Sequence, residues 1–324
     1  MKNETQDPID AVITWVDGND PAHRARRAKY MTQCGQVLNE NARNPHRWES
    51  SHEIYYCLQS IHNHAPWVRR IWILVEAEGP DLSHLPQALR NKVHIALHDQ
   101  IFEGYTHVLP TFNSLAIESM MWRIEGLAER FLYFNDDVFL TSPLDPEDVF
   151  VGNRPVLRGE WVDYSKLLDD PVARVDPALF AHFMHINGAA LHGYGAENLF
   201  ACAHVVHPLR RSVMAGLFAQ HGDAFLSNIS HRFRDLNQFL PQGAHTHMSL
   251  RSGEFVQGSA IDHLHILSGQ GAGQPSEKTR ALLTAEGLRD VRFLCVNDLP
   301  QLEALIPDVR ALIAQAVGGM SPQH

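Results

Sequence analysis

Two adjacent carboxylates interrupt a run of apolar residues near the middle of the chain. The stretch RFLYFNDDVFL (Arg130–Leu140) places Asp136 and Asp137 between two apolar halves. Isolated buried charges are costly, so such acids are normally paired, hydrogen-bonded or bound to a metal ion. Either the pair ends a strand at a turn, where Asn135 and Asp136 would cap free amides, or it lies in a site that supplies a counter-charge.

A divalent cation is the counter-charge that these side chains suit. Mg²⁺ prefers oxygen ligands and usually binds one or two carboxylates together with substrate phosphate oxygens. Adjacent residues of an ideal strand point to opposite faces, so both acids reach one ion only if the chain turns there. If the acids form such a site, we expect Asp137 to be its main residue and Asp136 to be a supporting ligand or an orienting group.

Short apolar runs and amphipathic stretches alternate along the first half of the chain. Strands are predicted over 11–16, 69–77, 92–99 and 131–134, with a helix before Pro66 and another that Asn113 or Ser114 caps. Strands separated by helices predict an α/β fold with a mostly parallel central sheet flanked by helices. Ligands bind such sheets at the carboxyl ends of the strands. Because Asp17-Gly18 and Asp136-Asp137 both follow predicted strands, we expect them to line the rim of a cleft.

The second half of the chain predicts fewer elements. A helix is expected over 208–218, and the strand VRFLCV precedes an amphipathic helix near the C-terminus. The residues expected on the buried stripe of this helix are Leu302, Leu305, Ile306, Val309, Leu312 and Ile313. The Gly-, Ser- and Gln-rich segment 268–278 reads as a linker or a lid. The predicted organisation is a core over 1–267, a flexible loop over 268–280, and a C-terminal strand and helix over 281–324 that pack on the core.

Composition narrows the class of protein. With 324 residues the chain can bury a large core, and its net charge of -10 argues against a protein that coats nucleic acid. The four cysteines are far apart and form no CxxC pair, which indicates a reduced, intracellular chain. No signal-peptide core is present, and no apolar run approaches the roughly 20 residues that span a bilayer. Any membrane association is expected to be peripheral.

Four ordered blocks resemble the Stealth family of hexose-1-phosphate transferases. That family includes bacterial capsular polysaccharide phosphotransferases and the catalytic subunit of the lysosomal-targeting GlcNAc-1-phosphotransferase. IDAVITWVDGNDP resembles the first block, and SIHNHAPWVRRIWIL, LPTFNSLAIES and FLYFNDDVF resemble the second. HVVHPLRRSV followed by SHRFR resembles the third block, and RFLCVND the fourth. One departure is SSHEIYYCLQS, where Glu53 is kept but Tyr55 and Gln59 replace basic residues; if those positions touch substrate, the specificity differs here.

The resemblance implies a reaction and a setting for it. A nucleotide-activated sugar, for example a UDP-hexose, gives its sugar-1-phosphate to a glycan hydroxyl and releases a nucleoside monophosphate, with Mg²⁺ or Mn²⁺ as cofactor. The implied fold is GT-A-like, and the implied role is capsular or extracellular polysaccharide synthesis in a bacterium. The expected partners are a nucleotide-sugar donor and a glycan acceptor, without nucleic acid. The expected location is the cytoplasm, including peripheral association with the inner membrane or the capsule machinery.

The resemblance also implies roles for particular residues. His204 matches the histidine of the third block and would accept the proton of the acceptor hydroxyl, with His207 and His231 as competitors. Arg234 matches the arginine of the HRFR element, whose fork of donors suits phosphate oxygens, or it forms a surface salt bridge. Asp298 matches the acid of the fourth block and would bind metal or orient the acceptor. Asp298 also reads as a helix N-cap, since a glutamine follows three residues later.

Substrate contacts are implied for a further set of residues. Asp17 and Gly18 are candidates for the nucleotide end of the cleft, because glycine permits close backbone approach and aspartate can accept from ribose hydroxyls. The same residue types suit a plain strand-to-loop turn. Asn113, His231 and Arg232 are the other substrate-binding candidates.

Two other functions are compatible with these residues. A metal-dependent GT-A glycosyltransferase would share the sheet, the acids and the metal, but it would release a nucleoside diphosphate. A non-catalytic carbohydrate-binding scaffold could keep the fold without turnover. The released nucleotide separates the first alternative from phosphotransfer, and substitution of Asp137 or His204 tests the second.

Overall fold

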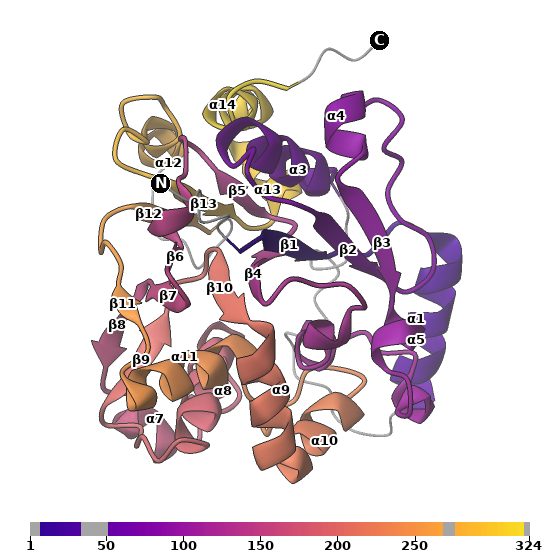
Figure 1. Cartoon of the computed structure of the whole chain (residues 1–324), viewed down its shortest axis with the longest axis vertical. Coiled ribbons are helices and arrows are strands. Elements are labelled where there is room, and N and C mark those ends of the chain that lie inside the picture. Colours follow the sequence, from indigo (N-terminus) through magenta and orange to yellow (C-terminus); the bar gives the residue numbers. More distant parts are fainter. Residues whose placement is uncertain (1–6, 34–50, 268–275, 321–324) are drawn as a thin grey trace, which may run out of the picture.

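A five-stranded sheet forms the centre of the computed structural model, which describes residues 7–33, 51–267 and 276–320. The strand order is β10-β4-β1-β2-β3, where β4, β1, β2 and β3 are parallel and β10 is antiparallel to β4. The bounds are β1 Ile9–Thr14, β2 Ile71–Val75, β3 Val93–Leu97, β4 Arg130–Asn135 and β10 His207–Arg210. The predicted α/β class with a mostly parallel central sheet is confirmed (Figure 1).

Helices cover both faces of this sheet because its strands are apolar on both sides. In β1, Ala11 and Ile13 pack into a core cluster with α3 (Glu53–His64), while Val12 packs into a second cluster on the opposite face. A central strand of a parallel sheet is buried on both faces, which explains its unbroken apolar run. The second cluster includes residues of α6 (Ser114–Glu118), α9 (Arg211–Gln220) and α10 (Gly222–Ser230). Figure 1 shows α3 above the sheet and α9 and α10 below it.

A smaller three-stranded sheet, β12-β13-β5, adjoins the first. Its strands are β5 Val138–Leu140, β12 His263–Ile266 and β13 Phe293–Val296; β13 is parallel to β12 and antiparallel to β5. Only Asp136 and Asp137 separate β4 from β5. The acid pair is therefore the turn at which the chain passes from one sheet to the other.

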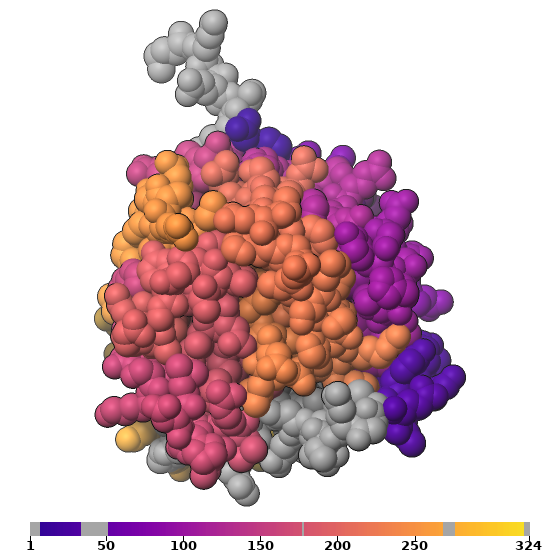
Figure 2. Space-filling view, turned by 90° about the horizontal axis from the view of Figure 1, so that it is seen from below, coloured from indigo at the N-terminus to yellow at the C-terminus, as the bar shows by residue number. Residues whose placement is uncertain are grey.

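The remaining elements surround these two sheets. Short strands are β6 Phe150–Val151, β7 Arg154–Leu157, β8 Gly159–Val162, β9 Leu199–Cys202 and β11 Val256–Gln257. The other helices are α1 Pro21–Gln33, α4 Gln87–Arg90, α5 His98–Ile101, α7 Ser165–Leu168, α8 Phe180–Ala190, α11 Pro241–Ser252, α12 Ser276–Leu282, α13 Leu299–Leu305 and α14 Val309–Ala316. Seen from below, magenta to orange segments from the middle of the chain and its second half cover most of the surface, and indigo α1 lies at one edge (Figure 2). No described helix has both the length and the apolar character that crossing a membrane requires.

Three predicted elements differ in the structure. The helix expected over 208–218 starts at Arg211, because His207–Arg210 form β10 against β4. The helix that Asn113 caps ends at Glu118, and a separate 3₁₀ turn follows at Met121–Arg123. The loop expected over 268–280 includes helical residues from Ser276 onward, while 268–275 lie outside the described residues.

The prediction of a single C-terminal helix is also wrong, because Pro307 divides this segment into α13 and α14. Proline lacks the N–H that a helix interior requires and disfavours the helical conformation in the preceding residue. As a result Leu305 is 57% exposed and does not belong to the buried stripe. Four of the other expected residues are buried, and Leu312 is partly buried against them: Leu302, Ile306, Val309 and Ile313.

Candidate active site

A cleft of about 930 Å³ opens at the carboxyl ends of β1, β2, β3 and β4. Residues from distant parts of the chain form its wall. They include Thr14 and Trp15 after β1, Glu76 after β2, His98 after β3, the acid pair after β4, and His204, Arg234, His265, Asn297 and Asp298 from the second half. The structure therefore brings six of the predicted site residues into one cavity: Asn113, Asp136, Asp137, His204, Arg234 and Asp298.

The acid pair lies in a strongly negative part of this wall. Burial, and then the neighbouring Asp137 and Glu53 carboxylates, raise the pKa of Asp136 well above its ordinary value. Glu53 begins α3, and burial followed by the Asp137 charge raises the pKa of its carboxyl as well. Since like charges act on both Asp136 and Glu53, a cation bound here would relieve the repulsion.

The C-terminal strand holds Asp137 in place. Asn297 donates from Nδ2 to Asp137 Oδ2 at 2.5 Å, and the amide of Val296 donates to the Asp137 carbonyl at 3.0 Å. The side-chain oxygen of Asn297 lies 2.5 Å from His265 Nε2. Asn297 thus links the acid pair to a histidine of β12.

Asp298, the next residue, has the left-handed conformation, with φ of 51°. Aspartate adopts this region more readily than most residues, at a small cost in backbone energy. Its side chain lines the cleft and makes no capping hydrogen bond to α13. The N-cap alternative is therefore not realised.

The three candidate histidines have different environments. His204 is exposed in the cleft, and its ring centroid lies 5.0 Å from that of His265. His207 also lines the cleft, but burial, and then the nearby His204, lower its pKa to about 3, so it is a weak base. His231 is not in the wall; its carbonyl accepts a hydrogen bond from Asn113.

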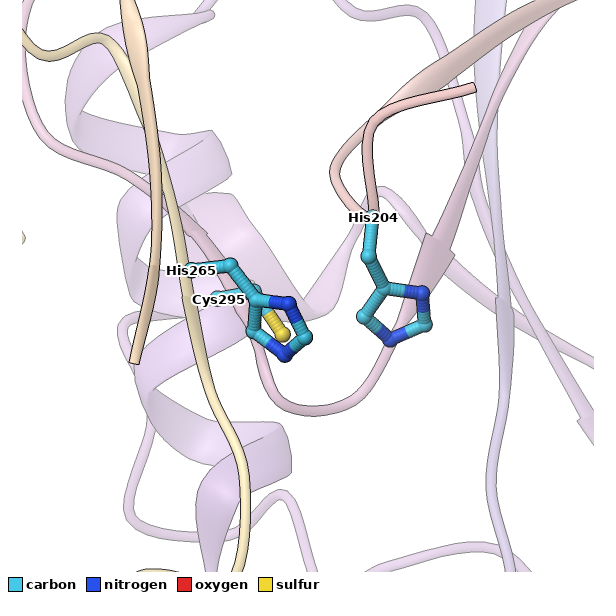
Figure 3. Close-up of side chains that lie close together, drawn as sticks. All are labelled: His204, His265 and Cys295. Atoms are coloured by element: carbon cyan, nitrogen blue, oxygen red, sulfur yellow. The ribbon is translucent and has the colours of Figure 1, made fainter. Parts of the chain in front are cut away.

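His204 also belongs to a group of potential metal ligands. Its ring, that of His265 and the Cys295 thiol place ligand atoms within 4.8 Å of one another (Figure 3). Nitrogen and sulfur donors suit zinc and similar ions, whereas Mg²⁺ prefers the oxygens of the acid pair. Burial raises the pKa of Cys295 well above its ordinary value, and the Asp137 and Asp136 charges add to this effect.

Arg234 supplies positive charge to the cleft wall. Its Nη2 donates to Ser114 Oγ at 2.8 Å, and no described carboxylate lies within salt-bridge distance of it. Burial lowers its pKa, while Glu118, Tyr133 and Asp137 act in the opposite direction. Since arginine remains protonated in proteins, Arg234 is a partly buried cation whose charge acts on Asp137.

Several predicted substrate-binding residues serve the fold instead. Asp17 accepts from the amide of Asn19 at 2.8 Å, and Gly18 accepts from Arg24 at 2.9 Å, so DGNDP is a turn outside the cleft wall. Arg232 donates to the Pro110 carbonyl at 2.6 Å and also lies outside the wall. These contacts within the fold account for the residue types at these positions, with no need for a contact to substrate.

Asn113 lines the cleft, but internal contacts occupy its side chain. It accepts from the Leu115 amide at 3.2 Å, which confirms the predicted cap of α6. Its amide donates to His231 O and Gln238 Oε1, each at 2.8 Å. Tyr55 and Gln59, the departures from the family pattern, do not line the cleft.

Sequence reasoning missed His265, Asn297, Glu118 and Gln242 in the cleft wall. Asn297 precedes Asp298 directly, and His265 alternates with apolar residues along β12, so both had a local signal. Glu118 accepts from Tyr133 at 3.0 Å and from Gln242 at 2.9 Å. The position of Glu118 beside Arg234 follows only from the tertiary fold.

Two family models match the N-terminal half of the chain. Residues 7–33 match conserved region 1 of the Stealth proteins, and residues 47–156 match conserved region 2. The second match includes the acid pair, whereas His204, Arg234 and Asp298 lie beyond both matches.

Curated relatives cover the rest of the chain. An exopolysaccharide phosphotransferase of Streptomyces coelicolor is 30% identical over 313 residues, 95% of this chain and 49% of that protein. A capsular polysaccharide phosphotransferase of Actinobacillus pleuropneumoniae is 31% identical over 241 residues, 73% of this chain and 62% of that protein. The chain thus spans about half the length of the curated relatives that it matches.

Likeness to solved structures is weak. A galactosyltransferase in complex with donor and acceptor sugar analogs shares 10% identity at a TM-score of 0.44, covering 97% of this chain and 96% of that one. Mouse xyloside xylosyltransferase shares 12% identity at a TM-score of 0.39, covering 89% of this chain and 96% of that one. The GT-A-like likeness expected from the sequence is therefore a prediction that rests on the family alone.

Proposed function

Because the chain belongs to the Stealth family, we propose that it transfers hexose-1-phosphate from a nucleotide sugar, UDP-linked, to a glycan hydroxyl in capsular or extracellular polysaccharide synthesis. One observation carries the proposal. A single cleft gathers the acid pair, an exposed histidine, a partly buried arginine and Asp298 from segments that are far apart in the chain. Phosphoryl transfer depends mostly on positioning and charge stabilisation, and these are the residue types that provide both.

The proposed roles follow from the geometry. His204 is exposed in the cleft and takes the proton of the acceptor hydroxyl as the oxygen attacks phosphorus. A new P–O bond to the acceptor forms while the bond to the nucleoside monophosphate breaks, and the monophosphate leaves with the bonding electron pair. Arg234 stabilises the charge that develops on the transferring group.

The residues of the acid pair fit a divalent cation. Burial and like charge raise the pKa of Asp136, and the nearby carboxylates offer only oxygen donors. Asp136 and Asp137 would hold the ion, with Asn297 fixing the orientation of Asp137. When bound, Mg²⁺ or Mn²⁺ would neutralise phosphate charge.

The location that suits this function is the cytoplasm, with peripheral attachment at the inner face of a bacterial membrane. A nucleotide-sugar donor would be available there, and a membrane-bound acceptor glycan would be within reach. Fractionation of cells that produce the protein, with a salt wash of the membranes, tests this part of the proposal.

The released nucleotide tests the reaction class. Purified protein is incubated with Mg²⁺, a panel of nucleotide sugars and an acceptor glycan, and the nucleotide products are separated by chromatography. Release of UMP together with a phosphodiester product supports the proposal, whereas UDP indicates a glycosyltransferase. Absence of turnover with every donor and acceptor pair would favour a binding scaffold.

Asp137→Asn tests the role of the acid pair in that assay, and Asp163→Asn is its matched control. The variant keeps the size and hydrogen-bonding shape of the side chain but removes its charge. We expect kcat to fall by at least about 100-fold, the scale seen when one electrostatic contact to a transition state is lost. Asp163→Asn, which changes an exposed turn residue outside the cleft, should retain the parental rate.

A further inference from the structure

Two buried polar side chains of the cleft wall have no hydrogen-bond partner among the described residues. His98 is 5% exposed and lines the cleft, and neither of its ring nitrogens has a hydrogen-bond partner in the described chain. Thr111 is 4% exposed and lines the same cleft, and its hydroxyl is also without a partner. Buried polar groups are almost always hydrogen-bonded, so such exceptions call for an explanation such as a ligand.

Neighbouring contacts place these residues together. The ring of His23 lies 5.3 Å from that of Phe112, the residue after Thr111, and the charge of His23 acts on His98. Glu76 makes no hydrogen bond to the ring of His98. Its carboxylate accepts from His23 at 3.0 Å and from Arg26 Nε and Nη2, each at 3.0 Å. The neighbouring charges are thus already paired with one another.

A third unpaired donor lies between this group and the acid pair. Trp15 follows β1 and lines the cleft, and its indole Nε1 is buried without a described acceptor. An indole offers one donor, a hydroxyl offers a donor and an acceptor, and a neutral imidazole offers one of each. Burial lowers the pKa of His98 to about 4, so its ring is neutral at pH 7.

The order of the strands gives the distance from the acid pair to His98. The order β4-β1-β2-β3 puts the acid pair and His98 at the ends of strands that are three spacings apart. At about 4.8 Å per spacing this is about 14 Å. A diphosphate held at the acid pair and extended along the rim would therefore bring its nucleoside to Trp15, Thr111 and His98.

We propose that Trp15, His98 and Thr111 form the subsite that recognises the base of the nucleotide donor through hydrogen bonds to its polar edge. This assignment rests on the proposed function. It replaces Asp17 and Gly18, whose polar groups are used within a turn, as the nucleotide end of the cleft.

Binding of nucleotides without turnover tests the subsite. The affinities of UMP, CMP, GMP, AMP and ribose 5-phosphate are measured by calorimetry with Mg²⁺ present, for wild type and for the His98→Phe and Thr111→Val variants. Wild type should bind one nucleotide more tightly than ribose 5-phosphate, which has the sugar and phosphate but no base. Each variant should lose about tenfold or more of that preference, while ribose 5-phosphate binds as before.

Thermal unfolding of the ligand-free variants provides a second readout. His98→Phe and Thr111→Val remove buried polar atoms that have no partner, so the ligand-free protein should unfold at the same or a higher temperature. A purely structural role for either residue predicts a lower midpoint. His192→Phe and Thr279→Val alter buried residues outside the cleft and should leave nucleotide affinity unchanged.

The outcomes separate the two proposals. The base subsite would be overturned if both variants kept the parental nucleotide affinity. It would also be overturned if wild type showed no preference for any nucleotide over ribose 5-phosphate. Wild type that binds neither the nucleotides nor ribose 5-phosphate would contradict the proposed function itself, and the subsite with it.

Discussion

At the scale of single residues, the cleft combines groups that oppose one another with groups that have no partner. Burial and the charges of Asp137 and Glu53 raise the pKa of Asp136, whereas the side chains of His98 and Thr111 are buried without a hydrogen-bond partner among the described residues. Both conditions cost free energy in the empty protein and are relieved when a complementary ligand binds. The wall of one cleft contains both kinds of group.

Binding of Mg²⁺ should stabilise the protein through the acid pair. At a concentration 100-fold above Kd, the ion should raise the free energy of unfolding by about 2.7 kcal/mol, since it binds only the folded form. Asp137→Asn should show little of this gain, and Asp163→Asn should show all of it. Urea unfolding with and without Mg²⁺ measures the effect. An equal gain in Asp137→Asn and wild type would remove Asp137 from the cation site.

His204 should be distinguishable from its competitor His231 by kinetics. His204→Ala should lower kcat by about 10² to 10⁴, the usual contribution of a general base. His231→Ala should change kcat by less than about twofold, because His231 lies outside the cleft wall. A larger loss in His231→Ala than in His204→Ala would contradict the assignment of the base. Steady-state rates of nucleotide release measure both variants.

At the scale of elements, apolar runs were sufficient to predict β1, β2, β3 and β4. Each contains a short run of mostly apolar residues, and that pattern is local, although β3 is only partly buried. The strand β10 was missed because its residues also suit a helix, and only pairing with β4 makes them a strand. The order of the strands and the attachment of β13 to β5 depend on contacts between distant segments, which no local pattern records.

Asn297, which directly follows β13, should determine the affinity for Mg²⁺. Asn297→Ala removes the hydrogen bond to Asp137 and the contact with His265, so Mg²⁺ affinity should fall by about tenfold or more. Calorimetric titration of Mg²⁺ provides the measurement. Asn63→Ala is the matched control: this amide donates to the Val317 and Gly319 carbonyls far from the cleft, so its loss should leave Mg²⁺ affinity unchanged. Unaltered Mg²⁺ affinity in Asn297→Ala would show that Asp137 needs no such support.

A buried ion pair ties β7 to the smaller sheet and should give stability a defined pH dependence. Arg158 donates from Nη2 to Asp262 Oδ2 at 2.8 Å, and both side chains are less than 10% exposed. Burial would raise the pKa of Asp262, but hydrogen bonds from His263 and Arg158 outweigh it and lower the pKa to about 2. Because the folded pKa is below the unfolded value of about 3.9, the contribution is complete above pH 4 and is lost as pH falls through about 2.

Asp262→Asn should therefore lose about 3 kcal/mol at pH 7, since it leaves Arg158 buried without its counter-charge. Urea unfolding at pH 7 and pH 3 should show a smaller difference from wild type at pH 3. Glu286→Gln, in an exposed pair with Arg289, is the control and should change stability little at either pH. A difference that stays constant or grows toward pH 3 would contradict the assigned pKa direction.

At the scale of the whole molecule, the sequence predicted part of the cleft and not its boundaries. Asp136, Asp137, His204, Arg234 and Asp298 came from ordered blocks, and the fold brings all five to one cavity. His98 and Thr111 could not be predicted, because burial without a partner is a property of the assembled structure. The turn at Asp17 shows the converse, since its residue types suit a nucleotide contact but serve the local backbone.

The turn between β4 and β5 has a consequence for the folding of this protein during its translation. Its carboxylates leave the ribosome well before Asn297, which lies 160 positions later and fixes one of them. A growing chain would thus carry the negative pair without the amide that orients it or the strand that covers it. Capture of the ion, and of any donor that depends on it, would wait until Asn297 has emerged.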